Sequence, residues 1–447
     1  MDLTDRASRK VVQLVQVHPP VPRGHSACTI LSGARVLGRS VDDGADLVLE
    51  DPLVSRAHAR LDPRAEGGFV VTDLGSKNGV FVDGRKVPAS VLPDGSVLRL
   101  GGTLLVVREV GVDAPPPMPP GLPFAGSSPA LRQVEEACRR IAPTPATVLL
   151  RGETGTGKEV FARYLHRCSG RRGRFVAVNC AAVSAGLFES AFFGHRKGAF
   201  TGATKDFGGH AKAAAGGTLF LDEVAELPDE SQAKLLRFLE SGELATVGEP
   251  DAAIVDVRVV AATNQDLESR LQSGRLRGDL YARLAQRVVV LPPLRKRPED
   301  ALEIARSRLP AGHPGLSADA AEALAVHDWP FNVRELLAVM DAAVTDAPAG
   351  VPLPLGVLPD AIRGRVTRRP VESPPSRMIP AGRQAPAPDD SSDTIAQPVA
   401  CAPDPAPSRD AFTAVFRDCG GNVSEVARRL GKDRRQVYRW MDRYGLK

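Results

Sequence analysis

Residues 147–158 read TVLLRGETGTGK, an apolar run followed by a glycine-rich loop that ends in a lysine. Glycine lets backbone N–H groups turn toward phosphate oxygens, and Lys158 adds a charge that reaches the β- and γ-phosphates. Glu159 follows, where Ser or Thr usually serves as a magnesium ligand. The stretch predicts a buried strand, a phosphate-binding loop and a helix, the opening of an α/β P-loop domain. The residues expected to bind ATP are Gly152, Glu153, Thr154, Gly155, Thr156, Gly157, Lys158 and Glu159.

A second apolar run, residues 216–223 with the sequence GGTLFLDE, ends in two acids. We expect Asp222 to position Mg²⁺ through water and Glu223 to polarise the attacking water. Apolar runs at 147–150, 175–178 and 257–261 also alternate with helical stretches, which predicts a parallel sheet. An acidic pair that starts a solvated helix is the plainer interpretation, and the length of the apolar run argues against it.

Between these two motifs lies the hexapeptide GAFTGA, Gly198–Ala203. It carries no catalytic side chain, and an exposed Phe between glycines is a poor core residue but a good contact residue. Because the hexapeptide is inserted between two phosphate-site motifs, nucleotide state can move it and its tip can press on a partner. An ordinary surface hairpin is the alternative interpretation.

On these three motifs, the central third of the chain resembles the bacterial enhancer-binding ATPases that remodel sigma-54 RNA polymerase. In that family the loop commonly ends in GKE, as it does at Glu159. The resemblance implies an AAA+ ATPase with a helical lid, with ATP and Mg²⁺ as cofactors and sigma-54 RNA polymerase as a partner. It also implies a homo-oligomeric ring, a hexamer, that rests as a dimer when inactive. It assigns the sigma-54 contact to Gly198, Ala199, Phe200, Thr201, Gly202 and Ala203.

The resemblance assigns two amides to the catalytic site. Asn179 follows the apolar run at 175–178 and matches the residue that restrains Glu223 until the site is engaged. Asn264 ends the next apolar run and matches the sensor of the γ-phosphate.

Three arginines complete the implied catalytic set. Arg277 and Arg283 match the arginines that reach into a neighbour's ATP site, where they stabilise transition-state charge. The ring follows from this role, since such arginines act in trans. Arg334 lies in the lid motif WPFNVREL at 329–336 and matches the nucleotide-sensing arginine of the lid.

Several positions depart from the family pattern without removing a group needed for ATP hydrolysis. They concern instead how tightly hydrolysis is coupled to the hexapeptide loop. Two of the departures replace charged residues of the family: Lys212 stands for an acid and Thr246 for a base. This is consistent with the joint loss of one family ion pair. The departures are Arg196 for a usual acid, Ala211-Lys212 for Phe-Glu, Thr246 for Arg, Phe331 for Gly and Ala338 for Asn.

Residues 9–111 alternate short apolar runs with Gly, Asp, Asn and Pro. Short strands at that spacing predict a β-sandwich. The apolar runs expected to be strands are 11–17, 35–37, 47–49, 69–72, 80–82, 97–100 and 104–107.

Three motifs of this segment occur in order: GRS at 38–40, SRAH at 55–58 and DLGSKNG at 73–79. Together they resemble the forkhead-associated (FHA) domain, a reader of phosphothreonine. A phosphate dianion needs charged and hydroxyl donors held on rigid loops, and these motifs supply them. A set of tight turns with solvated charges is the alternative. The resemblance assigns Arg39 and Ser55 to the phosphate, Arg56 and Lys77 as assisting groups, Asn78 to the peptide backbone and His58 to hydrogen bonding beneath the loop.

The net charge of +5 is confined to the last 37 residues. Residues 411–447 hold nine Lys/Arg and four Asp/Glu, whereas the remaining chain holds 49 of each sign. The segment predicts two helices around Gly431 with apolar residues at helical spacing, and it resembles the Fis-like helix-turn-helix. Its partner would be double-stranded DNA at an upstream, enhancer-like site. The residues expected to contact DNA are Arg434, Arg435, Gln436, Tyr438 and Arg439.

The chain is thus expected to be multidomain: an FHA β-sandwich, an α/β AAA+ P-loop ATPase with a helical lid, and an all-α helix-turn-helix. A chain of 447 residues is too long for one core. Proline-rich stretches separate the domains, and the second, with 14 prolines and no aromatic residue, is expected to be disordered. The expected bounds are 9–111 for the sandwich, 112–123 for a linker, 124–347 for the ATPase with its lid from about 295, 348–408 for the second linker and 409–447 for the DNA-binding domain.

The sequence predicts a cytoplasmic protein, because MDLTDRASRK lacks the apolar stretch of a signal peptide and no run reaches the length of a membrane helix. The predicted function is that of a sigma-54-dependent transcription activator, with a phosphothreonine protein or a Ser/Thr kinase upstream. The alternative is a phosphorylation-responsive DNA-binding regulator whose weak ATPase does not remodel polymerase. A third idea is an intramolecular switch in which phosphorylated Thr394 occupies the FHA site.

Overall fold

The structure is a computed structural model, and it describes residues 10–20, 28–111, 126–182, 185–199, 203–249 and 252–366, together with Phe412, Arg417, Val426 and Arg429. The chain divides into two compact units, Met1–Val371 and Glu372–Lys447. Within the described residues, no helix has the length and apolar character needed to span a bilayer. The predicted linker 112–123 lies outside the described residues, as do residues 367–408 of the second linker.

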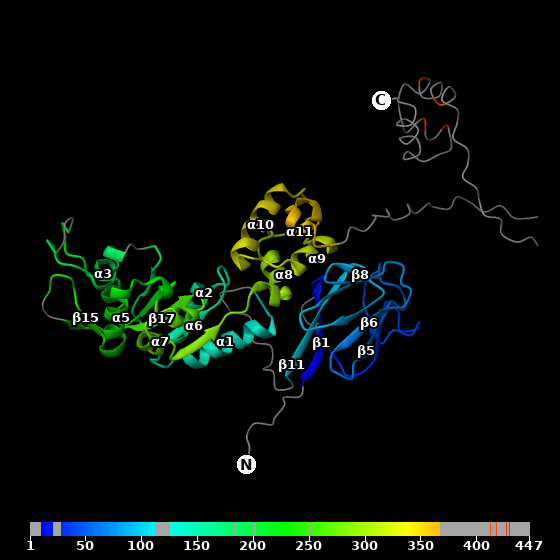
Figure 1. The fold of residues 1–447 in the computed structure, drawn as a ribbon. Helices are drawn as coiled ribbons and strands as arrows, with labels where there is room; N and C mark the ends of the chain where they lie inside the picture. The colour runs from blue at the N-terminus through cyan, green and yellow to red at the C-terminus, as the bar shows by residue number, and fades with distance from the viewer. Residues whose placement is uncertain are drawn as a thin grey trace, which may run out of the picture. The chain divides into compact units, whose positions relative to one another are not determined.

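The first part of unit one is a β-sandwich, drawn in blue and cyan in Figure 1. One sheet has the strand order β2-β1-β11-β10-β7-β8 and the other β4-β3-β5-β6-β9. The predicted apolar runs coincide with strands, and the sequence did not predict β2, β5, β8 and β9. The strands are β1 (Lys10–His18), β2 (Cys28–Leu31), β3 (Arg35–Gly38), β4 (Leu47–Val48), β5 (Ala59–Pro63), β6 (Phe69–Asp73), β7 (Val80–Val82), β8 (Arg85–Val87), β9 (Ala89–Leu92), β10 (Val97–Leu100) and β11 (Thr103–Gly111).

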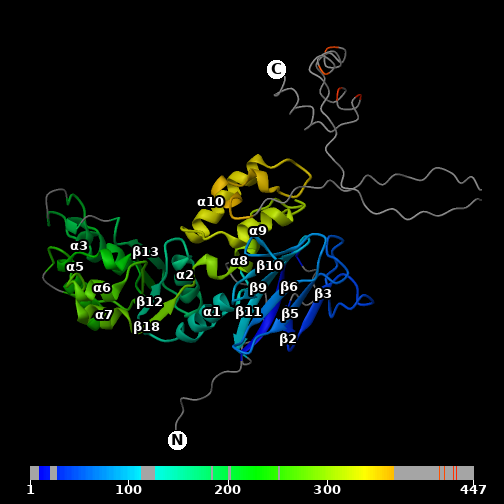
Figure 2. The same ribbon diagram turned by 45° about the vertical axis from the view of Figure 1, so that its right-hand side comes forward.

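The second part is an α/β domain around a parallel sheet of order β13-β14-β17-β12-β18. Figure 2 shows its strands with helices on either side. Alternate residues of each strand enter two cores: Leu150 packs with α1 and α2, and Leu149 with α3, α5 and α7. The elements are α1 (Pro129–Ile141), β12 (Val148–Arg151), α2 (Lys158–Cys168), β13 (Phe175–Asn179), α3 (Ala185–Phe193), α4 (Gly209–Ala213), β14 (Thr218–Asp222), η1 (Val224–Glu226), α5 (Asp229–Ser241), β15 (Glu243–Leu244), β16 (Ala253–Ile254), β17 (Arg258–Thr263), α6 (Leu267–Gln272), α7 (Gly278–Leu284) and β18 (Arg287–Val290).

A helical lid follows β18 and packs around Trp329, which is fully buried. The prediction that the chain is an unfolded linker from residue 348 is wrong for its first part. Leu353, Leu358 and Ile362 are buried in the lid core, because this proline-rich stretch carries apolar residues at the positions that face it. The lid elements are η2 (Leu294–Lys296), α8 (Pro298–Ser307), α9 (Ala318–Val326), α10 (Asn332–Asp346), η3 (Leu355–Val357) and α11 (Asp360–Arg363).

Strands β10 and β11 are buried on both faces. Leu98 and Leu105 point into the sandwich core, whereas Val97, Leu104 and Val106 belong to the same apolar cluster as the lid. An antiparallel sheet usually keeps one face in water, so two-sided burial marks a second packing surface. The sandwich therefore contacts the lid through the outer face of one of its sheets.

Glu322, on α9, gives this contact a pH dependence. Its side chain is 1% exposed and lies 2.8 Å from Arg99 Nε, with Asp319 and Asp83 also acting on it. Burial raises the pKa of Glu322 to about 7, although Arg99 opposes the shift. Because the folded pKa lies above the unfolded one, the favourable contribution is complete below about pH 4.5 and is lost as pH rises through 7.

We expect the Glu322→Gln variant to lack this titration. In urea unfolding at pH 5 and pH 8, the unaltered chain should lose up to about 3 kcal/mol more stability than the variant over that interval. Parallel pH dependences in the two proteins would contradict the assignment.

In the second unit the structure describes four residues, all helical. Phe412 and Val426 are buried, and Arg417 and Arg429 are exposed. The residues predicted to contact DNA, 434–436, 438 and 439, lie outside the described residues.

Candidate functional site

The P-loop, residues 152–158, connects β12 to α2 in the way its sequence predicts. Gly155 and Gly157 have φ angles of 78° and 102°, in the left-handed region that favours glycine. A Cβ on Gly155 would lie 2.1 Å from the carbonyl oxygen of Phe331, so a side chain there is excluded. The amino group of Lys158 donates to the carbonyl oxygens of Gly152 and Glu153 at 3.0 and 3.4 Å.

The lid touches the P-loop directly. The N–H of Val333 donates to the carbonyl oxygen of Gly155 at 3.0 Å. The amide of Asn332 donates to Thr154 O and to a carboxylate oxygen of Glu153. Arg295 pairs with the same carboxylate through two bonds of 2.6 and 2.8 Å and lowers its pKa.

The sequence patterns do not assign Asn332 or Arg295 to the site. The available signals were the basic run LRKR at 294–297 and the position of Asn332 inside the lid motif. Neither signal specifies a partner, because the contacts join residues about 140 to 180 positions apart.

The acidic strand end lies beside the P-loop lysine. Glu223 Oε1 is 3.7 Å from Lys158 Nζ, and both side chains are largely buried. Glu223 has a φ of 52°, a strained conformation for a side-chain-bearing residue that is common at functional sites. Burial raises the pKa of Asp222, and Lys158 and Arg334 oppose the shift. Lys158, the acidic pair Asp222-Glu223 and Arg334 are thus close enough to interact electrostatically.

The two predicted amides lie at the same edge of the sheet. The Asn264 backbone N–H donates to Glu223 Oε2 at 3.2 Å, and its side-chain amide donates to Thr154 Oγ1 at 2.8 Å. Asn179 is the register partner of Asp222 in the neighbouring strand. Its side-chain oxygen accepts the N–H groups of residues 181 and 182, so in this conformation it caps its own loop.

The arginines predicted to act in trans lie on the surface. Arg277 is half exposed and pairs with Asp279 at 2.7 Å. Arg283 is similarly exposed and lies 3.4 Å from Glu240. Both side chains are accessible to a neighbouring molecule.

The structure describes the two arms at the base of the hexapeptide loop, whereas its tip, 200–202, lies outside the described residues. His195 and Phe207 exchange two backbone hydrogen bonds, and Gly198 N donates to Ala203 O at 2.8 Å. These bonds bring the two arms of the loop together. The described part of the loop thus forms a closed, paired stem.

Three of the departures from the family pattern meet at Glu249. Arg196 pairs with Glu249 at 2.6 Å and with Asp206 at 3.0 Å, which links both arms of the loop to the segment after β15. The pKa of Glu249 is lowered first by Arg196, with smaller contributions from Thr246 and Lys212. Arg196, Thr246 and Lys212 therefore all interact with one acid, Glu249.

The residues predicted to bind phosphothreonine come from three loops of the sandwich. The N–H of Arg39 donates to the carbonyl oxygens of Ser55 and Arg56, each at 3.0 Å. The N–H of Lys77 donates to Ser55 Oγ at 3.1 Å, and the Asn78 amide donates to Leu53 O at 2.5 Å. A hydroxyl, an amide and three basic side chains consequently lie along one edge.

Gly38 and His58 hold these loops together. A Cβ on Gly38 would lie 1.9 Å from Arg56 O, so only glycine permits this approach of the two loops. His58 is fully buried, accepts the Ser55 N–H at Nδ1 and bonds Gly79 O through Nε2. The acceptor role of Nδ1 requires the proton to reside on Nε2.

Family models match three segments of the chain. Residues 35–101 match the FHA domain, residues 124–290 the sigma-54 interaction domain, and residues 414–446 a homeodomain-like domain. The order of the three matches agrees with the order predicted from the motifs.

Individual relatives agree with these matches. A putative uric acid sigma-54-dependent transcriptional regulator, UacR of Escherichia coli K12, is 43% identical over 53% of this chain and 41% of its own. The nitric oxide reductase transcription regulator NorR2 of Cupriavidus necator is 40% identical over 72% of this chain and 63% of its own. The chain therefore spans only about two fifths to three fifths of the length of these relatives.

Among solved structures, NtrX from Brucella abortus in complex with ADP superimposes with a TM-score of 0.50 at 26% identity, over 73% of this chain and 70% of NtrX. In one sequence the chain thus matches an FHA domain, a sigma-54 interaction domain and a homeodomain-like domain, and it is similar to a sigma-54-dependent transcriptional regulator.

Proposed function

We propose that the protein is a transcription activator that hydrolyses ATP to remodel closed complexes of sigma-54 RNA polymerase. The observation that carries the proposal is the position of the hexapeptide loop. Along the chain the loop lies between the P-loop and the acidic strand end, and its two arms form a paired stem in a domain that matches the sigma-54 interaction model. Movement at the nucleotide can therefore reach Phe200 and Thr201, the residues proposed to contact sigma-54.

The proposed hydrolytic site combines Lys158, Glu223 and Asn264, which lie in contact, with Asn179 and Arg334. Lys158 holds the β- and γ-phosphates and Glu223 polarises the attacking water. Asn264 senses the γ-phosphate, Asn179 restrains Glu223 and Arg334 senses the nucleotide from the lid. The ADP complex of NtrX supports nucleotide binding by this kind of domain.

Asp222 is the proposed Mg²⁺ residue, acting through water. Mg²⁺ is usually held by one or two carboxylates together with substrate phosphates and water. The donor set fits this pattern, since Asp222 offers a carboxylate beside the P-loop lysine. When bound, the ion would supply positive charge to the phosphates.

We also propose a ring, a hexamer formed from a resting dimer, in which Arg277 and Arg283 enter a neighbour's site. The exposure of both side chains supports this role, because each is accessible from outside the chain. Their ion pairs with Asp279 and Glu240 are surface pairs, which cost little to exchange for a phosphate.

Input and output lie at the two ends of the chain. The sandwich is proposed to bind a phosphothreonine segment, supplied by a Ser/Thr kinase or its substrate, through the loops that carry Arg39 and Ser55. The carboxyl-terminal domain is proposed to bind double-stranded DNA upstream of the promoter through residues 434–436, 438 and 439. These activities place the protein in the cytoplasm.

The test is transcription from a sigma-54 promoter with the Thr201→Ala variant. We expect ATP-dependent activation to fall by about tenfold or more while ATPase activity stays within about twofold, since the side chain contacts the partner and not the nucleotide. Thr204→Ala, three residues further along on the exposed stem, is the matched control. Unchanged activation by Thr201→Ala contradicts remodelling and favours the alternative, a DNA-binding regulator with a weak ATPase.

A further inference from the structure

The segment that leads into α8, residues 295–299, is held against the P-loop on one side. Arg295 pairs with Glu153 through two bonds. Arg297 is 3% exposed and donates to the carbonyl oxygen of Thr156 at 3.2 Å. Two basic residues of this segment, which we call the α8 entry segment, thus contact the loop that carries Lys158.

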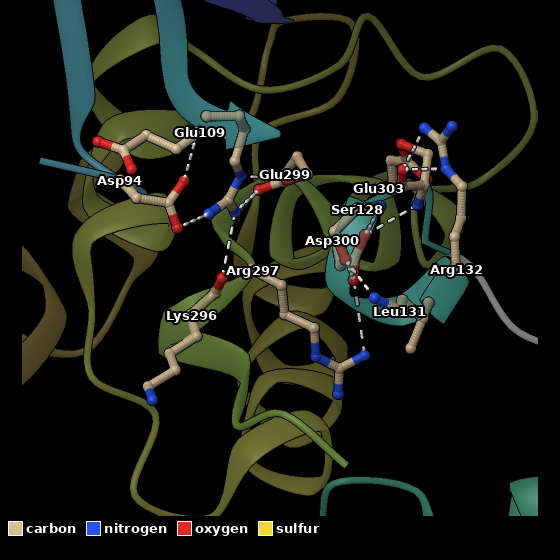
Figure 3. A network of polar contacts seen from close by, with 12 residues as sticks. Asp94, Glu109, Ser128, Leu131, Arg132, Lys296, Arg297, Glu299, Asp300 and Glu303 are labelled. Atoms are coloured by element: carbon tan, nitrogen blue, oxygen red, sulfur yellow. Dashed lines mark hydrogen bonds and ion pairs between the residues drawn. The ribbon is translucent and has the colours of Figure 1, made fainter. Parts of the chain in front are cut away.

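The sandwich holds the same segment from the other side. Arg108 on β11 donates through Nε to Glu299 Oε1 at 2.8 Å, and its Nη2 donates to the second carboxylate oxygen and to Lys296 O. Asp94 lies 3.6 Å from Arg108 Nη1. Figure 3 shows Asp94, Lys296 and Glu299 close to one another, with Arg297 beside them.

The contact is buried, which distinguishes it from a surface ion pair. The side chains of Arg108 and Glu299 are 6% and 3% exposed. Removing one member would leave the other charge buried without its partner, and such losses are among the most costly for a packed interface. Arg99 and Glu322 form a second pair of the same kind, at 3% and 1% exposure.

The first turn of α8, which continues the α8 entry segment, is also tied to the start of α1. The carboxylate of Asp300 accepts the N–H groups of Ser127 and Ser128, each at 2.8 Å, and the Ser128 hydroxyl at 2.7 Å. Arg297 lies 3.6 Å from the same carboxylate. The α8 entry segment and the first turn of α8 are therefore held by the sandwich and by the α/β core, while the side chains of Arg295 and Lys296 remain exposed.

We propose that the outer face of β10 and β11 is a docking surface for the lid of the same chain, and that Arg108 is a positioning residue for the nucleotide site. Through Glu299 it holds the α8 entry segment so that Arg295 and Arg297 keep the P-loop in shape. A preordered P-loop binds nucleotide more tightly, because less ordering remains to be done on binding. The phosphopeptide reader thereby acts on ATP within its own chain, before any ring forms.

This inference rests on the proposed function in one respect, namely that the P-loop binds nucleotide. The two can fail separately. If the unaltered chain binds neither ATP nor ADP, the proposed function fails. If it binds them and the Arg108 variants bind equally well, the docking proposal fails alone.

The experiment measures the dissociation constant of fluorescent ADP with the full chain. We expect Arg108→Ala and Glu299→Ala each to weaken binding by about tenfold, and the double variant to weaken it by little more than either one. The charge-exchanged variant, Arg108→Glu with Glu299→Arg, should recover most of the affinity. Hydrogen exchange of residues 153–158 should rise in the single variants. The matched control is Arg60→Ala, which removes an arginine from an exposed pair on another strand of the sandwich.

Unchanged or tighter ADP binding by Arg108→Ala overturns the proposal, as does additivity of the two alanine substitutions. If Arg108→Ala fails to fold, Arg108→Lys replaces it. Lysine keeps the charge but cannot make the two parallel bonds, so an intermediate loss of affinity is expected. Equal affinity in the folded lysine variant, with exchange at 153–158 unchanged, is likewise a negative result.

Discussion

Replacing Glu223 with glutamine is expected to leave nucleotide binding intact and to slow ATP hydrolysis by about a hundredfold or more. The carboxylate lies 3.7 Å from Lys158 Nζ and accepts the N–H of Asn264, so it lies between the P-loop and the end of β17. Glutamine preserves the size of the side chain and its hydrogen bond but cannot take a proton from water. Steady-state ATPase rates and ADP binding, measured on the same preparations, separate the two effects.

Glu226→Gln is the matched control for this experiment. Glu226 lies three residues further on, is exposed and pairs with Arg270 at 3.2 Å. Its replacement should change the ATPase rate by less than about twofold. A Glu223→Gln variant that hydrolyses ATP at the original rate would show that another group activates the water.

Arg39→Ala is expected to weaken binding of a phosphothreonine peptide by about a hundredfold. The backbone of Arg39 is fixed by two hydrogen bonds to the loop that carries Ser55, so its guanidinium is presented from a rigid position. Alanine leaves that backbone geometry in place and removes the charge-assisted bonds, which are the strong ones for phosphate. Calorimetry with phosphorylated and unphosphorylated peptide measures the change.

Arg56→Ala provides the comparison within the same site. Its side chain is 71% exposed and lies 3.6 Å from Asp43, an arrangement that is worth little in water. We expect a loss of affinity below about tenfold. Equal losses in the two variants would mean that the phosphate is held by diffuse charge, and binding unaffected by Arg39→Ala would also remove the proposed switch through Thr394.

The sequence predicted best the features that a short stretch of chain encodes by itself. The P-loop needs glycine at 155 and 157 because of local φ angles, and the acidic pair must follow a buried strand. Strand alternation and βα rhythm likewise depend on near neighbours. The fold class and the order of the domains therefore followed from patterns of a few residues each.

Contacts between distant segments could not be predicted in the same way. Residues 353–366 look like linker by composition, and only the lid core shows that Leu353, Leu358 and Ile362 have a place to pack. Arg295 and Arg108 look like surface charges until Glu153 and Glu299 are brought beside them. Nor does sequence reveal that Arg196, Lys212 and Thr246 act on a single acid, Glu249.

The two-sided burial of β10 and β11 has a consequence for the modularity of the sandwich. An FHA fold that stands alone needs an outer sheet face that is compatible with water. The outer face of this one carries Val97, Leu104 and Val106, together with Arg99 and Arg108, which pair with acidic residues of the lid. Without the lid, the sandwich would expose this apolar outer face to water and would be prone to aggregate. Joined to another ATPase, it would lack the acidic residues Glu299 and Glu322 that pair with its arginines. The sandwich and lid of this chain therefore form one exchangeable unit, whose natural boundary lies beyond residue 111.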